Sequence, residues 1–472
     1  MIPLSAPLQK LIEHLSSHSV RPIFVGGFVR DYFTGRENID LDIELYGVTS
    51  LETLETLLKP FGKINVVGKS FGVLKLSYNG YNIDFSPPRN ESKHGHGHKG
   101  FEITWLSDID YPAAARRRDF TINSIGYDPL NKTLLDPYGG VEDLKRKRLA
   151  CVDPATFVDD PLRVLRAIQF AARFELTCDE TLLNLCRTMI SEGALEELPK
   201  ERIFEEFKKL LLQSDSPSIG LKLLREMGGL PFFSPLDLLE STPQNPDSHP
   251  EGSVWNHTLM CVDAMASERT GEAKHDLGLM FAALLHDIAK PATTITINGY
   301  LYSPEHAFKG VAVAREWLWR ITEDKSLTAA VLPLIEYHGW PRKLHRLQVE
   351  DPEILRLSTH VCIDDLIRIA RADFFGRGFS GEKPHRFDAG EWLYERAVSL
   401  GVLHTPPAPF VMGRDLIDIG LTPSDEFKII LETAYDAQLN QLFSTHSEAL
   451  DWIRNHLKSH PHFSPSFRQF PS

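Results

Sequence analysis

A glycine pair near the start of the chain has the setting of a phosphate-binding turn. Gly26 and Gly27 follow the apolar run 22–25, which we expect to form a buried strand, and Arg30 comes shortly after. Glycine has no Cβ, so backbone N–H groups can approach a phosphate closely at such a turn. A tight turn without a ligand has the same sequence, and the pair alone does not separate the two.

Two aspartates follow on the next predicted strand, segment 39–45. Asp40 and Asp42 share one face of that strand, because side chains two residues apart project to the same side. Two carboxylates that close repel each other unless a cation lies between them, and a hard divalent ion with oxygen ligands suits that place. Asp84 ends a predicted hairpin and is placed to be a third carboxylate. A solvated strand edge is the alternative, but the aspartates and the glycine pair together predict Mg²⁺-dependent nucleotidyl transfer.

Arginines downstream supply the positive charge that a triphosphate needs. Arg118 closes a run of three arginines, 116–118, and an aspartate follows it. Guanidinium groups bind phosphate oxygens through two parallel N–H donors, so the run predicts a triphosphate clamp.

The segment 159–174 begins like a helix, with an acid at the N-cap and a proline in the first turn. Asp160 and Arg163 lie one turn apart, and Arg166 lies one turn further along. An acceptor and a donor presented together can pair with the edge of a base, much as another base does. On an isolated helix the same two residues form an intrahelical salt bridge, and this alternative stays open.

The second half of the chain carries a series of histidines and aspartates on predicted helices: His257, His286, Asp287, His306, His338 and Asp373. Helices are expected over 255–265 and 278–289, the second of which includes His286 and Asp287. Neutral imidazole and carboxylate together suit a divalent transition metal, and one aspartate can bridge two ions. Lys290, one turn past Asp287, is placed to hold a phosphate. Histidines of the core or the surface that bind no metal are the alternative.

The periodicity of apolar residues predicts that the glycine pair and the aspartates lie in an α/β unit. We expect helices and strands, in chain order, over 8–15 (helix), 51–58 (helix), 64–67, 73–78 and 81–85 (strands). Asn79-Gly80 joins the last two strands as a two-residue hairpin turn. Residues 243–250 are expected to form a linker or the entry to a domain. The region from Gly401 is expected to be helical, and the last dozen residues are expected to be disordered.

The composition fits a globular protein of several domains. The chain has 472 residues, of which 42% are hydrophobic and 24% charged, and no apolar run long enough to span a bilayer. Its five cysteines have no C-x-x-C spacing, which favours the cytoplasm and argues against a disulfide framework or a cysteine zinc site. The net charge of −13 means that a polyanion must be met by local basic patches, such as 116–118 and 145–148. The run of glycine and histidine at 94–98 is expected to be a flexible loop.

These motifs, in this order, resemble the class II CCA-adding tRNA nucleotidyltransferases and the related bacterial poly(A) polymerases. The resemblance runs from Pro22 to about Leu212 and ends with the neck motif 201–204. It implies a polymerase-β-like head that uses Mg²⁺, CTP and ATP on tRNA. In that head Asp40 and Asp42 bind the metal. The residues that it assigns to nucleotide binding are Gly27, Arg30, Arg118, the base-selecting pair Asp160 and Arg163, and Arg166.

The second half resembles an HD-domain phosphohydrolase, as found fused to members of the same family, with implied phosphatase and 2′,3′-cyclic phosphodiesterase activities. The expected fold is α+β, with a mixed-sheet head followed by helical parts. The expected domains are 1–145 (nucleotidyltransferase head), 146–242 (helical neck), 243–385 (HD domain) and 386–472 (C-terminal helical region).

Three positions depart from the family pattern. Ala114-Ala115 stands where Asp-Leu is common, Gln169 where an arginine is common, and Asp159 where Glu is common. The first two concern a flexible loop and the nucleotide pocket, so they bear on the switch from C to A. The alternatives are therefore an A-adding or CC-adding enzyme, a poly(A) polymerase, and, from another class, an HD phosphohydrolase whose head only grips RNA.

Overall fold

The computed structural model describes residues 2–48, 50–67, 73–93, 101–105, 109–379 and 384–459. The chain divides into two compact units, one of Met1–Leu238 with Trp317–Glu323 and one of Leu239–Glu316 with Asp324–Ser472. The glycine-histidine run 94–98 and the last dozen residues lie outside the described residues, and the four predicted domain boundaries stay predictions.

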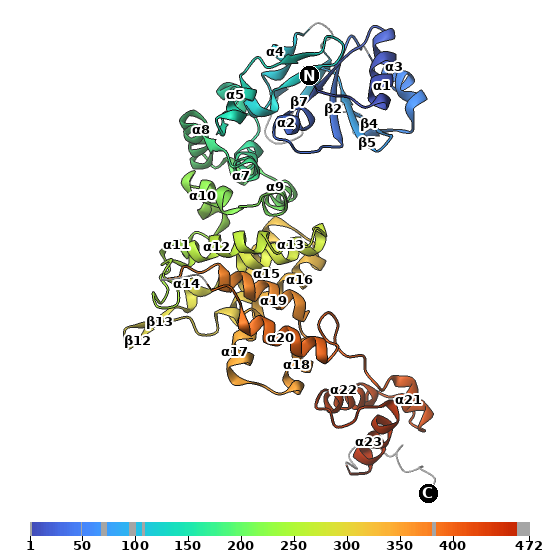
Figure 1. Cartoon of the computed structure of the whole chain (residues 1–472), viewed down its shortest axis with the longest axis vertical. Helices are drawn as coiled ribbons and strands as arrows, with labels where there is room; N and C mark the ends of the chain where they lie inside the picture. Colours follow the sequence, from blue (N-terminus) through green and yellow to red (C-terminus); the bar gives the residue numbers. More distant parts are fainter. Residues whose placement is uncertain are drawn as a thin grey trace. The chain divides into compact units, whose positions relative to one another are not determined.

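The first unit begins with a mixed seven-stranded sheet, as predicted (Figure 1). Its strand order is β3-β4-β5-β2-β1-β8-β9, and only the β2/β5 pair is parallel among these neighbours. The strands are β1 Arg21–Val25, β2 Asp40–Tyr46, β3 Ile64–Val67, β4 Val73–Tyr78, β5 Tyr81–Ser86, β8 Gly126–Asp128 and β9 Thr133–Leu135. A separate ladder pairs β6 Arg89–Lys93 with β7 Phe101–Trp105.

The register between β2 and β5 brings the predicted carboxylates together. Asp42 lies opposite Asp84 on the parallel neighbour strand. The hairpin β4/β5 is confirmed, and its turn residues Asn79 and Gly80 have φ values of 48° and 85°. Left-handed conformation at both turn residues matches the twist of the strands, so the Asn-Gly pair fixes this hairpin and, with it, the position of Asp84.

Helices cover the sheet and carry several motif residues. They are α1 Ala6–Ser17, α2 Gly27–Phe33, α3 Leu51–Leu58, α4 Tyr111–Ala115 and α5 Gly140–Lys145, with 3₁₀ turns η1 Lys59–Phe61 and η2 Thr121–Asn123. The predicted helices at 8–15 and 51–58 are confirmed. α1 buries Leu8, Leu11 and Leu15 in the core of the sheet, as its apolar spacing requires.

The structure corrects the expectation for Ala114 and Ala115. Both were expected in a flexible loop, but they form the end of α4 and are fully buried. Ala115 packs in one cluster with Ile23 and Val25 of β1. The side chain of Asp110 caps α4 by accepting a hydrogen bond from the backbone N–H of Ala113 at 3.0 Å, which starts the helix here. A carboxylate at position 114 would be buried in this packing.

Helices follow the sheet within the first unit: α6 Pro154–Phe157, α7 Leu162–Phe174, α8 Glu180–Ser191, η3 Ala194–Glu197, α9 Lys200–Gln213, α10 Ser218–Glu226 and η4 Leu230–Phe233. α7 packs against both α9 and α10. Gly220 of α10 permits this contact, because a Cβ there would lie 2.7 Å from the backbone oxygen of Ile168. A two-residue parallel ladder, β10 Arg148–Leu149 with β11 Thr177–Cys178, was not predicted for this largely helical region.

The second unit is also largely helical. Its elements up to the C-terminal region are α11 Leu238–Ser241, α12 Val254–Ala266, α13 Ala273–Leu285, α14 Lys290–Thr293, β12 Ile295–Ile297, β13 Tyr300–Tyr302, α15 His306–Ile321, α16 Lys325–Tyr337, α17 Trp340–Leu347, α18 Asp351–Ser358, α19 Ile363–Phe375 and α20 Asp388–Ser399. α13 packs against α12, α16 and α19 and is buried from Asp276 to its end. It stops at Leu285, so His286 and Asp287 lie just past the helix rather than inside it.

The C-terminal region has a small core of its own. It contains α21 Gly413–Asp418, α22 Glu426–Leu439 and α23 His446–Ser459, which bury Leu416, Ile430 and Ile453 together. Across the described part of the chain, no helix is both long and apolar enough to cross a membrane.

Candidate active sites

The first unit contains a cleft of about 450 Å³ between the carboxylate edge of the sheet and α7. Most of the predicted nucleotide-binding residues line it. The charged and glycine residues of its lining are Gly26, Gly27, Arg30, Asp42, Glu44, Asp84, Arg117, Arg118, Asp119, Asp160, Arg163, Arg166 and Arg202. The predicted site residues therefore share one cavity, with the exception of Asp40.

Asp40 lines an adjoining hollow of about 390 Å³, together with Asp42 and Asp84. The amide of Asn82 donates to Asp40 at 3.1 Å, and Lys75 pairs with Asp84 at 2.8 Å. Partial burial raises the pKa of Asp42, which Arg118 opposes and the nearby charge of Asp84 reinforces. Three carboxylates and a single lysine line this hollow, so negative charge is in excess. This excess suits a hard divalent ion such as Mg²⁺, which prefers oxygen ligands.

At Gly26 the backbone lies close to the carboxylate of Asp42. Its φ of +65° is a left-handed conformation, and a Cβ there would lie 3.0 Å from Oδ2 of Asp42 and 3.7 Å from a guanidinium nitrogen of Arg118. Any side chain at this position would therefore be strained and would press on the carboxylate of Asp42.

A buried glutamate further along the same face of β2 organises the arginines. Glu44 accepts from Arg118 at 2.6 Å and pairs with Arg117 at 3.3 Å. Burial alone raises the pKa of a carboxyl, but the guanidinium of Arg118, together with Arg117, outweighs it and holds the pKa of Glu44 below its usual value. The buried Nε of Arg118 has no hydrogen-bond partner among the described residues. That donor is available to an anion in the cleft.

A hydrogen-bonded chain links α2 of the sheet domain to α7. Arg30 donates to the side-chain oxygen of Asn123 at 2.7 Å, and the amide of Asn123 donates to Asp119 at 2.9 Å. Nε of Arg166 donates to the other oxygen of Asp119 at 2.6 Å. Arg30 itself is buried and pairs with Asp31 at 2.6 Å, so it lines the cleft with most of its donors already engaged.

The predicted base-selecting residues are not paired with each other. Asp160 pairs with Arg202 of α9 at 2.9 Å, whereas Arg163 donates to the backbone oxygens of Thr156 and Arg117, each at 2.7 Å. The intrahelical salt bridge is therefore not formed, and both side chains are held at the cleft by contacts from outside their own helix.

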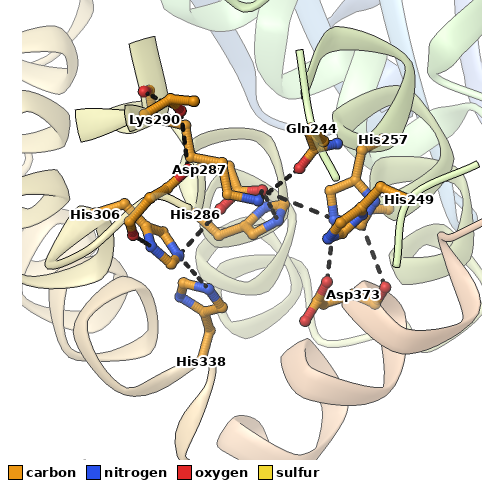
Figure 2. Close-up of polar contacts among 12 residues, drawn as sticks. Gln244, His249, His257, His286, Asp287, Lys290, His306, His338 and Asp373 are labelled. Atoms are coloured by element: carbon orange, nitrogen blue, oxygen red, sulfur yellow. Dashed lines mark hydrogen bonds and ion pairs between the residues drawn. The ribbon is translucent and has the colours of Figure 1, made fainter. Parts of the chain in front are cut away.

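The second unit gathers all six predicted HD residues into one buried cluster (Figure 2). The four histidines share one pattern, because Nδ1 of each lies within hydrogen-bonding distance of a fixed acceptor. The pairs are His257 with Glu251 at 2.9 Å, His286 with Ala283 O at 2.9 Å, His306 with Ser303 O at 2.7 Å and His338 with Ile335 O at 2.7 Å. These contacts assign the proton to Nδ1 and leave Nε2 as the lone-pair donor, which is the arrangement of metal-binding histidines.

The Nε2 atoms and carboxylates form two adjoining groups (Figure 2). In the first, Nε2 of His257 lies 3.0 Å from Asp373, and His286 belongs to the same group. In the second, Nε2 of His306 lies 3.4 Å both from Nε2 of His338 and from Oδ1 of Asp287. Oδ2 of Asp287 lies 3.2 Å from Nε2 of His286, so this carboxylate faces both groups.

Cations compensate the two buried carboxylates. Lys290 pairs with Asp287 at 2.6 Å and donates to Gln244 at 2.7 Å, while Arg342 pairs with Asp373. Burial alone lowers the pKa of an imidazole, but Asp287 outweighs it and raises the pKa of His286 to about 10. Nε2 of His286 is buried without a hydrogen-bond partner among the described residues. A divalent ion would replace the proton at this atom, so the cluster fits a metal centre.

Comparisons with known proteins cover both units of the chain. Three family models match the chain: the poly A polymerase head domain over residues 23–150, the probable RNA and SrmB-binding site of polymerase A over 175–236, and the HD domain over 254–370. A multifunctional CCA protein of Azoarcus sp. is 32% identical over 383 residues, which cover 79% of this chain and 88% of that protein. The chain belongs to the multifunctional CCA protein family.

Other relatives and solved structures fit this membership. A multifunctional CCA protein of Xylella fastidiosa is 33% identical over 386 residues, with 79% of this chain and 88% of that protein covered. The CCA-adding enzyme of Bacillus stearothermophilus, solved in complex with CTP, has a TM-score of 0.63 at 20% identity and covers 98% of this chain and 100% of its own. The Thermotoga maritima CCA-adding enzyme, complexed with tRNA, has a TM-score of 0.58 at 20% identity, with 96% of each chain covered. At these identities the likeness establishes the fold.

Several site residues of this family member were missed by sequence reasoning. Segment 243–250, expected as a linker or a domain entry, supplies Gln244 and His249, and the next residue, Glu251, orients His257. Arg202 and Arg342 are distant in sequence from the aspartates that they pair with. Apart from Arg202, which lies in the neck motif 201–204, nothing in the local pattern marks these residues, because each acts through a partner that only the fold brings near.

Gln169 was expected at the nucleotide pocket, where the family commonly has an arginine. It is 2% exposed and is not among the described residues that line the cleft. Its neutral side chain therefore lies in the packing of α7, and the loss of a nucleotide contact no longer follows from this substitution.

The close approach of Gly26 to Asp42 generates a prediction. Gly26→Ala should reduce nucleotide incorporation by about tenfold or more, because the added Cβ would displace the carboxylate of Asp42. A loss of about 1.4 kcal/mol of transition-state stabilisation is enough for a tenfold effect. Gly35→Ala is the matched control, since Gly35 also has a positive φ, +68°, but its added Cβ would meet no atom within 4 Å. Single-turnover incorporation and thermal unfolding of both variants measure the effect. Equal losses of activity in the two variants would contradict a specific role for Gly26.

Proposed function

We propose that this chain completes the 3′ end of tRNA by adding CCA from CTP and ATP. The observation that carries the proposal is the cleft in which Asp42 and Asp84 face Arg118, Asp160 and Arg163. Membership of the multifunctional CCA protein family supports the substrates, and solved relatives are described in complex with CTP, with ATP and with tRNA.

Three carboxylates of the sheet are assigned to the metal. Asp40, Asp42 and Asp84 would hold Mg²⁺, as their shared face and their oxygen donors favour. Bound there, Mg²⁺ makes the primer 3′-hydroxyl more acidic and neutralises the charge of the leaving pyrophosphate. The buried Nε of Arg118 donates to the triphosphate, and Gly26 and Gly27 let the backbone approach it.

Asp160 and Arg163 are assigned to base selection. Arg163 is braced by two backbone oxygens, so its remaining donors have a fixed direction. Asp160 is held by Arg202 across the cleft, and a base would have to compete with that ion pair for its carboxylate. An acceptor and a donor fixed in this way can distinguish the edges of C and A from those of U and G.

The HD cluster supports a second activity, hydrolysis of a phosphomonoester or a 2′,3′-cyclic phosphodiester. Its four Nε2 atoms, with Asp287 facing both groups, favour a pair of divalent transition metal ions. Such ions supply a hydroxide at neutral pH. Lys290, together with Arg342, would hold the phosphate of the substrate.

The proposal for the head is tested on a tRNA that ends at its discriminator base, with CTP and ATP present. We expect product ends that read CCA from the wild type. Asp42→Ala should give no extension but bind tRNA normally, since loss of a metal ligand costs on the order of several kcal/mol of transition-state stabilisation. Products that stop at CC, or that need a CC end supplied, would replace this proposal by a partial specificity. Homopolymer tails would indicate a poly(A) polymerase.

Base choice is tested by Arg163→Ala. We expect discrimination against UTP and GTP to fall by about 1–3 kcal/mol, because the variant lacks the donors that pair with the correct base edge and leave the wrong one unsatisfied. Misincorporation of each labelled nucleotide is measured beside Lys209→Ala, a control on the neighbouring helix α9 outside the cleft lining. A variant that is slower but equally selective would make Arg163 a brace between α7 and the backbone of Arg117.

The two activities are separated by substitution in the second unit. His286→Ala should abolish metal-dependent hydrolysis of a 2′,3′-cyclic nucleotide and leave nucleotide addition unchanged, because the residues of the two sites belong to different units. His404→Ala, an exposed histidine of the same unit, is the control. Hydrolysis that persists in His286→Ala would refute the second activity at this site, and a folded variant that loses both activities would show that the sites are coupled.

A further inference from the structure

A buried cysteine lies inside the HD cluster, although the spacing of the cysteines argued against a cysteine metal site. Cys261 is on α12, one turn after His257, and it is fully buried. Its Sγ lies 3.3 Å from Nε2 of His257. Sγ and the ligand atoms of His257, His286 and Asp373 all lie within 4.8 Å of one another. The same sulfur lies 3.8 Å from Nδ1 of His257, so the thiol is nearer to Nε2, the atom at which a metal would bind.

Close packing behind the thiol holds it at this position. Gly376, just past α19, touches Cys261, and a Cβ at Gly376 would lie 2.6 Å from Sγ and 2.7 Å from Cα of Cys261. The residue at 376 therefore has to be glycine for Cys261 and α19 to meet in this way. With this side closed, the sulfur remains directed at His257 and Asp373.

The separation between Sγ of Cys261 and Nε2 of His257 has the size of one edge of a metal coordination shell. With a Zn–S bond of about 2.3 Å and a Zn–N bond of about 2.0–2.1 Å, the sulfur and nitrogen of a tetrahedral site are roughly 3.5 Å apart. The observed separation between Sγ and Nε2 of His257 is 3.3 Å. A second, independent observation is Nε2 of His286, which is buried in the same group and makes no hydrogen bond among the described residues, although Oδ2 of Asp287 lies 3.2 Å away.

We propose that Cys261 is a metal ligand of the first HD group and makes that group selective for a thiophilic ion such as Zn²⁺ or Co²⁺. The thiolate would complete a shell of two imidazoles, one sulfur and one carboxylate from His257, His286, Cys261 and Asp373. The second group, Asp287, His306 and His338, offers only nitrogen and oxygen. The two positions thus differ in donor softness, and soft thiolate favours Zn²⁺ and Co²⁺ over Mg²⁺ or Mn²⁺. This inference rests on the metal centre of the proposed hydrolase and deepens it.

The experiment gives a different result if Cys261 does not bind the metal. If its thiol only fills space and donates a weak hydrogen bond to Nε2 of His257, the metal contacts no sulfur. Replacement by serine would then leave the spectrum of the bound metal unchanged.

The test uses the full-length protein, freed of metal and titrated with Co²⁺. We expect visible d–d bands together with a near-ultraviolet sulfur-to-cobalt charge-transfer band. Cys261→Ser and Cys261→Ala should lose the charge-transfer band, keep d–d bands, and bind Zn²⁺ about tenfold more weakly or worse while Mn²⁺ affinity changes by about twofold at most. Cys362→Ser is the matched control, since Cys362 caps α19 in the same unit and its thiol contacts the backbone oxygen of Leu403. That variant should keep both bands.

The outcomes separate this inference from the hydrolase itself. Cobalt d–d bands without a charge-transfer band in the wild type, or a charge-transfer band that persists in Cys261→Ser, would overturn the role of Cys261 and leave the hydrolase intact. Absence of any cobalt binding would overturn both. The wild-type spectrum decides the question even where a Cys261 variant fails to fold. Nucleotide addition and thermal unfolding report the folding of each variant.

Discussion

The buried carboxylate of Asp119 is the contact on which the arrangement of the cleft depends. It accepts hydrogen bonds from the amide of Asn123 and from Arg166, and so ties the sheet domain to α7. Burial alone raises its pKa, but Arg166 and Asn123 outweigh burial and keep the pKa below its usual value. Removal of this acid would leave a guanidinium uncompensated in the interior, which costs about 3–5 kcal/mol. This group therefore helps to hold α7, which carries Arg163 and begins two residues after Asp160.

The second unit also contains buried carboxylates whose charge needs a partner. Asp287 and Asp373 are buried, and their charge is balanced by Lys290 and Arg342 when no metal is bound. A buried charge without a partner is costly, so such a centre needs side-chain cations to remain folded in the metal-free state. Both sites of the chain therefore consist of charges that are paired within the protein and can exchange those partners for a ligand.

The sequence alone was enough to predict the features that depend on residues close together in the chain. The strand periodicity placed Asp40 and Asp42 on one face, and the Asn79-Gly80 turn predicted the hairpin that brings Asp84 beside them. It was insufficient where a contact depends on the fold. Cys261 is one helical turn from His257, but its spacing from the other cysteines argued against a metal role. Ala114 and Ala115 were misplaced because their burial against β1 is a tertiary contact.

The histidine rings of the second unit differ in what fixes their orientation. His286, His306 and His338 each direct Nδ1 to the backbone oxygen three residues earlier, whereas His257 depends on the side chain of Glu251. A backbone acceptor persists whatever amino acid occupies its position. Over evolutionary time, the residues around those three rings can thus diverge toward new substrates while the rings keep their aim. The fourth ring can only change together with its glutamate, so this pair is where divergence of the centre is most constrained.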